Sequence, residues 1–421
     1  MKVLVVGSGG REHALCWKLA QSPEVTKLYC TPGNAGIAQI AECLSGDPLE
    51  VARSIDADFV VIGPEVPLAA GLGDQLNAER FAYFGPDQRG AQIEASKTFC
   101  KELLRKYNIP TADFEAFDTA EAAKAYLSDR DSDMPVVVKA NGLAAGKGVV
   151  VATSRHEALA AVDELTNIDL TYQDAASRQI VVEECLVGDE VSLIALTDGE
   201  YVLPLVPAQD HKRIGEGDTG ANTGGMGCYS PVPAFTQELY EQTVTTILEP
   251  TIQALRAEGI EYRGALYAGL MLTSTGPKVL EFNCRFGDPE TEVILPRLKS
   301  DLLPLLWACA NTEGDLKNVT CEWTEQAAVG VVMASRGYPA PNYQKGQVIT
   351  GLKDAANTGA VVFHAGTIQR DGDIVSSGGR VLCVTALGDN FLQARQHCYA
   401  AVERIHFEGV QYRRDIGWRC L

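Results

Sequence analysis

Short apolar segments that each run into a turn of glycine and proline recur along the first part of the chain, and no other feature limits the fold as strongly. They are Lys2–Val6, Lys27–Cys30, Phe59–Ile62 and Ala82–Phe84, and a helical pattern follows the first of them. A strand, a glycine-rich turn and a helix form the opening unit of a doubly wound α/β domain. We therefore predict an N-terminal parallel-sheet domain over residues 1–100.

The turns that follow these strands are candidates for ligand binding, because ligands of open parallel sheets bind beyond the carboxyl ends of the strands. Asn34, Gly63 and Glu65 lie in such turns, although turn chemistry alone explains each of them equally well. The first turn reads G-S-G-G-R-E-H, and Glu12 stands where a nicotinamide-binding fingerprint has its third glycine. This loop is therefore a ligand-facing loop at a helix N-terminus or a plain tight turn, and a dinucleotide site is disfavoured.

Composition indicates an acidic multidomain protein of a reducing cytoplasm. A chain of 421 residues should form about two to four domains, because single cores stop growing near about 250–300 residues. The net charge of −19 opposes a general role on nucleic acid or membrane, but it does not oppose nucleotide binding. The 12 cysteines include no C-x-x-C pair, so zinc and redox motifs are not indicated. Met1–Val6 is too short for a signal sequence or a membrane span.

A lysine near the end of a strand precedes a glycine-rich loop in the second part of the chain. Pro135–Ala140 is predicted to be a buried strand that carries Lys139, and the loop N-G-L-A-A-G-K-G, residues 141–148, joins it to another strand. The loop lacks the spacing of a Walker loop, and no helix follows it. With Gly146 and Lys147 it can fold over phosphates as a flap, and a structural hairpin is the alternative.

The segment Lys278–Thr291 combines the periodicity of a strand with a cluster of polar side chains. Glu281 and Asn283 are two residues apart, so they point to the same face of a strand. A carboxylate and an amide oxygen side by side suit a hard cation such as Mg²⁺. Arg285 follows at once, and the neighbouring phenylalanines indicate a packed segment rather than a polar strand end. We therefore predict a metal site on this strand.

Gln209–Tyr229 is rich in glycine and is predicted to be a long loop without strands or helices. Such loops in compact domains are usually functional or disordered. Its charged residues suit a phosphate-bearing or zwitterionic small molecule, and they are Asp210, His211, Lys212 and Arg213.

Helical patterns cover Ser96–Tyr107, Thr236–Gly259 with a break only at Pro250, and Leu295–Ala310. Gly264–Thr273 is predicted to pair in an antiparallel way with Lys278–Asn283, the strand of the predicted metal site, which we call the metal strand. From residue 326 the chain is rich in strands and closes with a helix, which predicts a C-terminal α+β domain over residues 326–421. In this domain, His364 and the turn before Arg380 either face the site or are a core histidine and a hairpin turn.

A strand-end lysine, a glycine loop and an oxygen-ligand pair beside an arginine together indicate nucleotide-driven activation of an acid. The order Lys97, Lys139, glycine loop, E-E-C-L-V-G-D-E, E-F-N-C-R resembles the ATP-grasp superfamily of carboxylate–amine ligases. More narrowly, the chain resembles the phosphoribosylamine–glycine ligase (glycinamide ribonucleotide synthetase) family of purine biosynthesis. The motifs that carry this resemblance are V-L-V-V-G-S-G-G-R-E-H-A-L, Q-D-H-K-R, N-T-G-G-M-G, E-F-N-C-R-F-G-D-P-E-T, F-H-A-G-T and S-G-G-R-V-L.

The resemblance implies an ATP-grasp domain over residues 101–325, with a small lid subdomain at about residues 118–188. It implies that ATP phosphorylates the carboxylate of glycine. The amine of 5-phospho-β-D-ribosylamine then attacks the glycyl phosphate and gives glycinamide ribonucleotide, ADP and phosphate. Mg²⁺ or Mn²⁺ is the implied metal. We further expect a cytoplasmic monomer or weak dimer that binds neither nucleic acid nor membrane.

The resemblance also implies roles for individual residues. Glu281 and Asn283 are the expected metal ligands, and Arg285 is the catalytic residue that steadies the acyl phosphate. The expected ATP-binding residues are Lys97, Lys139, Gly146, Lys147, Glu183, Glu184 and Leu186, with Glu190 on the ribose. The candidate substrate-binding residues are Gly9, Gly10, Arg11, Glu12, Asn34, Gly63, Glu65, Asp210, His211, Lys212, Arg213, Asp288, Pro289 and Glu290.

One departure from the superfamily concerns the metal. Many ATP-grasp enzymes carry a further acid on the preceding strand, where this chain has Gly269. Phosphates and water then complete the ligand set, or Asp210 or Glu292 is recruited. The alternative functions are a ligase for another acid or amine, such as a glycinamide ribonucleotide formate ligase or an aminoimidazole carboxylase, a nicotinamide-dependent oxidoreductase, and a non-catalytic nucleotide-binding regulator.

Overall fold

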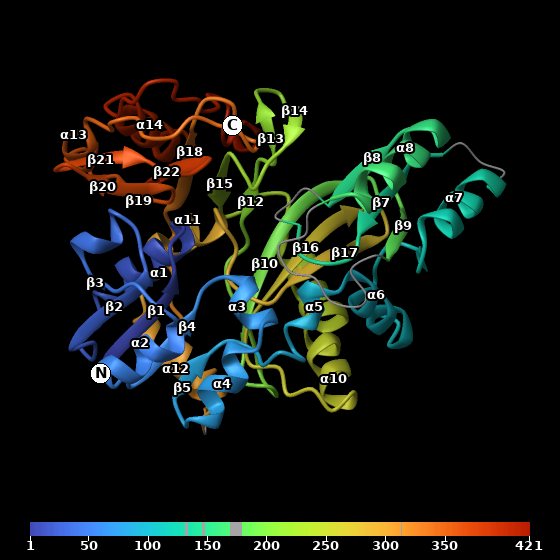
Figure 1. The fold of residues 1–421 in the computed structure, drawn as a ribbon, viewed down its shortest axis with the longest axis horizontal. Coiled ribbons are helices and arrows are strands. Elements are labelled where there is room, and N and C mark those ends of the chain that lie inside the picture. Colours follow the sequence, from blue (N-terminus) through green and yellow to red (C-terminus); the bar gives the residue numbers. More distant parts are fainter. Residues whose placement is uncertain (131–133, 145–147, 169–178, 313) are drawn as a thin grey trace.

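The computed structural model describes residues 1–130, 134–144, 148–168, 179–312 and 314–421. Two sheets, one from each end of the chain, lie on one side of the molecule, and a small sheet with two helices projects from the other side (Figure 1). A further sheet lies between them. No helix among the residues described is long and apolar enough to cross a membrane.

The N-terminal sheet is parallel throughout and has the strand order β3-β2-β1-β4-β5. The interior of its central strand, β1, is apolar and buried, with Val3, Leu4 and Val5 at 0% exposure. The predicted doubly wound domain is thus confirmed. Its elements are β1 (Lys2–Gly7), α1 (Gly10–Leu19), β2 (Lys27–Pro32), β3 (Glu42–Cys43), α2 (Pro48–Ile55), β4 (Phe59–Ile62), α3 (Glu65–Ala69), α4 (Leu72–Ala78) and β5 (Ala82–Phe84).

The projecting unit is an antiparallel sheet of order β6-β9-β7-β8 with its own hydrophobic core. We call it the lid. Its elements are β6 (Phe114–Phe117), α7 (Ala120–Asp129), β7 (Val136–Ala140), β8 (Val149–Ala152), α8 (Arg155–Thr166) and β9 (Ile180–Glu184). Helix α5 (Gln92–Ala95) and helix α6 (Lys97–Lys106), which begins at the N-cap Ser96, lead into it.

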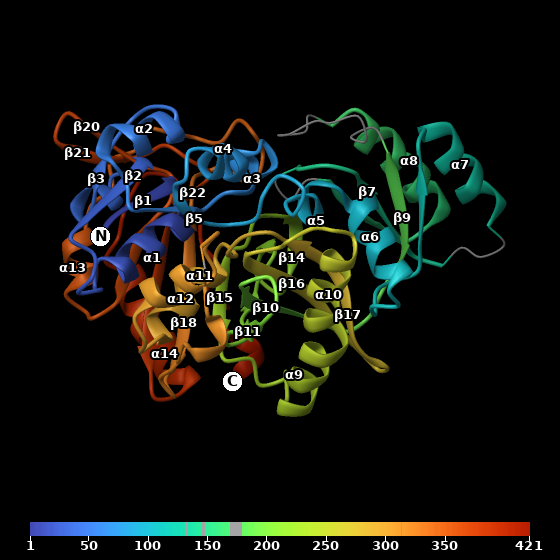
Figure 2. The same ribbon diagram turned by 90° about the horizontal axis from the view of Figure 1, so that it is seen from below.

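The middle sheet is antiparallel, with the order β11-β10-β16-β17. Its strands are β10 (Asp189–Thr197), β11 (Val202–Pro204), β16 (Gly264–Thr273) and β17 (Gly276–Asn283). Helices α6 and α9 (Gln237–Thr243) contact β17, and α10 (Glu249–Ala257) lies near them (Figure 2). These helices cover the face of the sheet opposite the polar side chains of β17.

The C-terminal sheet combines strands from two distant parts of the chain, in the order β12-β15-β18-β22-β19. Two of them, β12 (Gln209–Asp210) and β15 (Gly227–Ser230), come from the predicted loop, and the others are β18 (Ala327–Ala334), β19 (Val361–His364) and β22 (Arg380–Gly388). Helix α14 (Phe391–Val402) packs on β18 and β22. The hairpin β20 (Thr367–Arg370) and β21 (Asp373–Ser376) and the short helix α13 (Leu352–Ala356) complete this part.

Three expectations about secondary structure were wrong. The segment Gln209–Tyr229 contains strands. Strand β15 forms by pairing with the distant β18, and β12 pairs with β15, whereas β13 (Arg213–Gly215) and β14 (Thr219–Asn222) pair with each other as a local hairpin. The predicted helix Leu295–Ala310 is a 3₁₀ turn (Leu295–Arg297) followed by α12 (Leu302–Ala308), since Asp301 caps a new helix.

The third correction concerns Pro250, which does not interrupt its helix. A π-helical segment, Val244–Leu248, precedes it and joins α9 to α10. Proline is tolerated in the first turn of a helical segment because no N–H is needed there. The chain therefore winds on through Pro250.

Candidate active site

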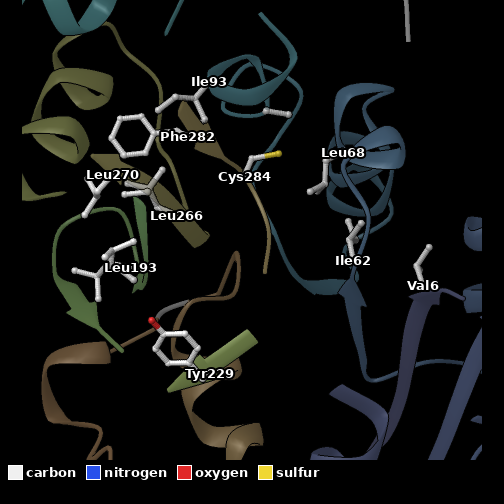
Figure 3. Packing of buried hydrophobic residues seen from close by; sticks show 14 of the residues in the cluster. Val6, Ile62, Leu68, Ile93, Leu193, Tyr229, Leu266, Leu270, Phe282 and Cys284 are labelled. Carbon is white, nitrogen blue, oxygen red and sulfur yellow. The ribbon is translucent and has the colours of Figure 1, made fainter. Parts of the chain in front are cut away.

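The predicted metal strand has the geometry that its sequence indicates. Phe282 and Cys284 are buried among apolar neighbours, as Figure 3 shows, whereas Glu281 and Asn283 point to the other face and stay partly exposed. In the pairing with β16, Gly269 lies directly opposite Glu281. The preceding strand therefore offers no acid at this position, as predicted from the sequence.

Positive charges surround the carboxylate of Glu281. Burial alone would raise the pKa of Glu281, but Lys212, Lys139, Lys97 and Arg285 together hold the pKa below its ordinary value. No hydrogen bond to this carboxylate is found within the described part of the chain. A charged, uncommitted carboxylate beside an amide oxygen fits a hard divalent cation whose other ligands are phosphate and water.

The two residues considered as a third metal ligand are less suited to the role than Glu281. Asp210 pairs with Lys212 at 3.1 Å. Burial raises the pKa of Glu292, on α11 (Glu290–Ile294), well above its ordinary value, which disfavours the charged form that a metal ligand needs. Within the ranges that the structure describes, no three or more His, Cys, Asp and Glu side chains are grouped to hold a metal. Glu281 and Asn283 are therefore the best-supported pair.

Two of the predicted ATP-binding lysines come from different elements and meet near β17. Lys139 at the end of β7 donates to the carbonyl of Leu280 at 3.0 Å and lies 2.9 Å from Oε2 of Glu183. Lys97, at the start of α6, donates to the carbonyl of Gly142 at 2.9 Å. The lid, α6 and β17 thus bring cationic side chains to one place.

The predicted adenine edge is the connection from β9 to β10. The N–H of Glu184 donates to the carbonyl of Asp113 at 2.8 Å, so this N–H is not free to bind a ligand. Leu186 follows in an irregular stretch, and Glu190 has an exposed side chain on β10. The side chain of Glu183 does not face solvent at all, because two lysines bind it. Gly146 and Lys147 of the predicted flap lie outside the described residues.

Arg285 is tied to two carboxylates from the N-terminal part of the chain. Its Nη2 donates to Oε1 of Glu94 at 2.9 Å, and its Nε lies 3.3 Å from Oε2 of Glu65. It also donates to the side chain of Asn283 at 3.4 Å. Burial would raise the pKa of Glu65, but Arg285 and Arg11 lower it to about 2. The predicted catalytic arginine is thus held rigidly beside the metal strand.

The glycine-rich loop that follows β1 joins the ion pairs around Arg285 and Glu65 through Arg11. Its guanidinium lies 2.5 Å from Glu12 and 3.9 Å from Glu65, and it donates to the carbonyl of Phe286 at 3.2 Å. The carboxylate of Glu12 accepts from the N–H of Gly9 at 2.6 Å. Glu12 therefore fills the space inside the loop.

Three of the predicted loop residues fit turn and packing requirements. A Cβ atom on Gly63 would lie 2.3 Å from Glu12, and one on Gly10 would lie 2.3 Å from Glu292. The amide of Asn34 donates to Ser8 and His364 and accepts from two backbone N–H groups. For Asn34 the structure thus favours the turn-chemistry interpretation.

A second polar cluster lies on β10, β12, β16 and α11. The carboxylate of Glu290 accepts from Ser192 at 3.0 Å and from Tyr267 at 3.1 Å. Burial and the nearby charge of Asp210 raise the pKa of Glu290. Lys212 remains 40% exposed at its side chain, although it pairs with Asp210. This cluster offers both signs of charge to a small zwitterion.

His211 and Arg213 lie on the other side of their segment, away from Asp210 and Lys212. Nε2 of His211 accepts from the N–H of Gly417 at 3.1 Å, and Arg213 donates to the carbonyl of Gly220 at 2.8 Å. Alternation along the extended chain produces this separation. Of the four candidate residues in this segment, Asp210 and Lys212 therefore lie on the side of the polar cluster, and His211 and Arg213 lie on the other side.

The buried His211 gives a testable pH dependence. Burial, with Arg413 and Arg419 nearby, lowers the pKa of His211 to about 4. The unfolded chain therefore takes up a proton at a higher pH, and stability falls as pH drops from about 6.5 to 4, by about 1.4 kcal/mol per pH unit for this one group. His211→Gln should flatten the pH slope of the free energy of unfolding in this range. Identical slopes in urea unfolding would contradict the assignment.

The turn at Asp288 and Pro289 binds the C-terminal sheet. Arg380 lies 3.0 Å from the Asp288 carboxylate and also donates to the carbonyls of Asp288 and Gly224. A Cβ atom on Gly225 would lie 2.5 Å from the Pro289 ring. His364, in contrast, is a buried core histidine whose N–H donates to His13. Arg380 on β22 therefore connects the C-terminal sheet to the turn at Asp288 and to the segment at Gly224, beside the candidate site.

Several residues of this arrangement were missed from the sequence, namely Glu94, Lys101, Ser192 and Tyr267. Glu94 and Lys101 lie on short helices with ordinary amphipathic patterns. Nothing in the local sequence marks these two residues. Their burial, which the structure shows, requires partners, because a buried charge needs one. The partner itself cannot be read from local sequence.

Comparisons with known proteins agree along the whole chain. Models of phosphoribosylglycinamide synthetase match its N domain at residues 1–94, its ATP-grasp (A) domain at residues 95–291 and its C domain at residues 328–419. Phosphoribosylamine–glycine ligases of Rhizobium meliloti and a Nostoc species are 51% and 52% identical to the chain. Each alignment covers 100% of this chain and 99% of the relative.

Solved structures agree with these matches. The phosphoribosylamine–glycine ligase of Thermotoga maritima has a TM-score of 0.83 at 34% identity, over 99% of this chain and 100% of that one. The biotin carboxylase domain of the Hydrogenobacter thermophilus 2-oxoglutarate carboxylase shares the fold, with a TM-score of 0.73 at 14% identity, over 97% and 91% of the two chains. The resemblance drawn from the motifs is thus confirmed, and the chain belongs to the phosphoribosylglycinamide synthetase family, the phosphoribosylamine–glycine ligases.

Proposed function

We propose that the chain performs the reaction of its family through a glycyl phosphate. The carboxylate of glycine attacks the γ-phosphorus of ATP and releases ADP. The amine of 5-phospho-β-D-ribosylamine then attacks the acyl carbon, and phosphate leaves with one former carboxylate oxygen. The products are glycinamide ribonucleotide, ADP and phosphate.

The observation that carries this proposal is the ring of cations around Glu281. The pKa of the Glu281 carboxylate is lowered by four cations, namely Lys97, Lys139, Lys212 and Arg285. No protein donor to this carboxylate is found among the residues described. Phosphoryl transfer depends on positioning and on charge neutralisation, which such a ring supplies to phosphate oxygens. Glu281 and Asn283 would hold Mg²⁺ or Mn²⁺, which would neutralise further phosphate charge when bound.

We propose the remaining roles on the family resemblance, and the positions of the side chains support them. We assign Lys97 and Lys139 to the ATP phosphates, the backbone from Glu184 to Leu186 to the adenine, and Glu190 to the ribose. Arg285 steadies the acyl phosphate. The substrates lie between the glycine-rich loop after β1 and the polar cluster around Glu290. The candidate substrate-binding residues are Gly9, Arg11, Glu65, Asp210, Lys212, Asp288 and Glu290. Residues 1–100, 101–325 and 326–421 are the proposed domains of a cytoplasmic monomer or weak dimer.

A coupled assay of ADP release tests this function. We expect turnover that requires ATP, glycine and phosphoribosylamine together, with each single omission as the control. Turnover with formate or bicarbonate, or with another amine, and none with glycine would identify a different ligase. A nucleotide that binds without any turnover would favour a non-catalytic regulator.

A further inference from the structure

A second buried lysine, Lys101, lies beneath the predicted nucleotide site. It follows Lys97 by one helical turn on α6, so the two side chains share a face. Lys101 is 2% exposed, and its Nζ lies 2.9 Å from Oε2 of Glu183. It also donates to Oγ1 of Thr111 at 2.7 Å. Lys101 thus binds the lid without being one of the residues assigned to the ligands.

Glu183 shares a single oxygen between two lysines. Nζ of Lys139 lies 2.9 Å from the same Oε2 that binds Lys101. The other oxygen, Oε1, is buried and has no hydrogen-bond partner in the part of the chain that the structure describes. Two cations on one oxygen fix the orientation of a carboxylate, which a single flexible lysine would leave free to rotate.

The same contacts connect the lid to the metal strand. Oγ1 of Thr111, which precedes the first lid strand, donates to the carbonyl of Val279 at 2.7 Å. Lys139 donates to the next carbonyl, that of Leu280, at 3.0 Å. Both carbonyls lie within two residues of Glu281. Lys101 therefore lies where the lid leaves the core and where the phosphate lysine meets the metal strand.

We propose that Lys101 is a positioning residue of the nucleotide site, which aims Lys139 at the phosphates by clamping their common partner Glu183. The proposal rests on the proposed ATP site. A purely structural role is an inferior explanation, because an apolar side chain would fill this interior without the cost of a desolvated charge. Without Lys101, Glu183 is free to turn toward Lys139 and to draw it away from Leu280.

Lys101→Met tests this role, because methionine keeps the length and loses the charge. We expect the Kd for ATP, measured by calorimetry, and the KM for ATP to rise about tenfold to a hundredfold, which corresponds to one or two lost charge-assisted hydrogen bonds. The KM values for glycine and phosphoribosylamine should stay within about twofold at saturating ATP. Lys106→Met is the matched control, because this lysine is exposed on the same helix and pairs with Glu258.

A double-mutant cycle separates positioning from general damage. With Glu183→Gln already present, Lys101→Met should weaken ATP binding by less than about threefold, because the clamp is already lost. If Lys101→Met does not fold, Thr111→Val removes one anchor at nearly constant volume and should weaken ATP binding about threefold.

Three results would overturn the proposal. They are wild-type affinity for ATP in every folded variant, equal rises in all three KM values, or effects that multiply fully in the cycle. The wild-type ligase assay tests the function separately, and ATP calorimetry tests Lys101 even if that assay fails.

Discussion

Replacement of Arg285 by alanine is expected to lower kcat/KM by about a hundredfold to a thousandfold. A preorganised cation at a developing charge is typically worth about 3–4 kcal/mol in the transition state, and Arg285 is fixed by Glu94, Glu65 and Asn283. The variant should also be less stable by about 3 kcal/mol, because Glu94 stays buried without its cationic partner and keeps only the N–H and thiol of Cys284 as donors. Steady-state kinetics and urea unfolding measure the two effects.

A second variant separates the chemical loss from the structural one. Burial raises the pKa of Glu94 even with Arg285 present, so a neutral side chain is favoured at this position when the arginine is removed. Arg285→Ala combined with Glu94→Gln should regain much of the stability and none of the turnover. If turnover returned together with stability, Arg285 would be a structural residue and not part of the mechanism.

Replacement of Glu281 by alanine is expected to abolish measurable turnover, with a loss of about a thousandfold or more, because it removes the charged member of the metal pair. The fold should persist, since no hydrogen bond to this carboxylate is found among the described residues. The binding of ATP should also lose its dependence on Mg²⁺ in calorimetric titrations.

The matched control for Glu281 is Glu238→Gln, an exposed carboxylate on α9. It should behave as the wild type in both assays. Wild-type Mg²⁺ dependence in the Glu281 variant would remove this residue from the metal site.

Strand periodicity was sufficient to predict the metal strand, because residues 281 and 283 must share a face whatever lies around them. Comparison with the superfamily pattern identified Gly269 as the position where many relatives carry an acid, and the pairing places Gly269 opposite Glu281. The lysine at the end of β7 was likewise visible from its place in an apolar run. Local pattern is enough where one element carries the whole feature.

The partners of these residues were not predictable, because they come from distant parts of the chain. Glu94 and Arg285 are 191 positions apart, and no periodicity relates them. The alternation that separates His211 from Asp210 and Lys212 was not predictable either, because the segment Gln209–Tyr229 was predicted to be a loop. The short strands β12 and β15 depend on pairing with β18, which local propensity cannot show. Tertiary contacts decided each of these cases.

The most direct measurement of the central claim follows the oxygen atoms of glycine. Glycine labelled with ¹⁸O in its carboxylate is incubated with the protein, ATP, Mg²⁺ and phosphoribosylamine, and the inorganic phosphate is analysed by mass spectrometry. A glycyl phosphate transfers one labelled oxygen to each phosphate released, because the amine displaces the phosphate at carbon. Unlabelled phosphate, formed together with glycinamide ribonucleotide, would contradict the account.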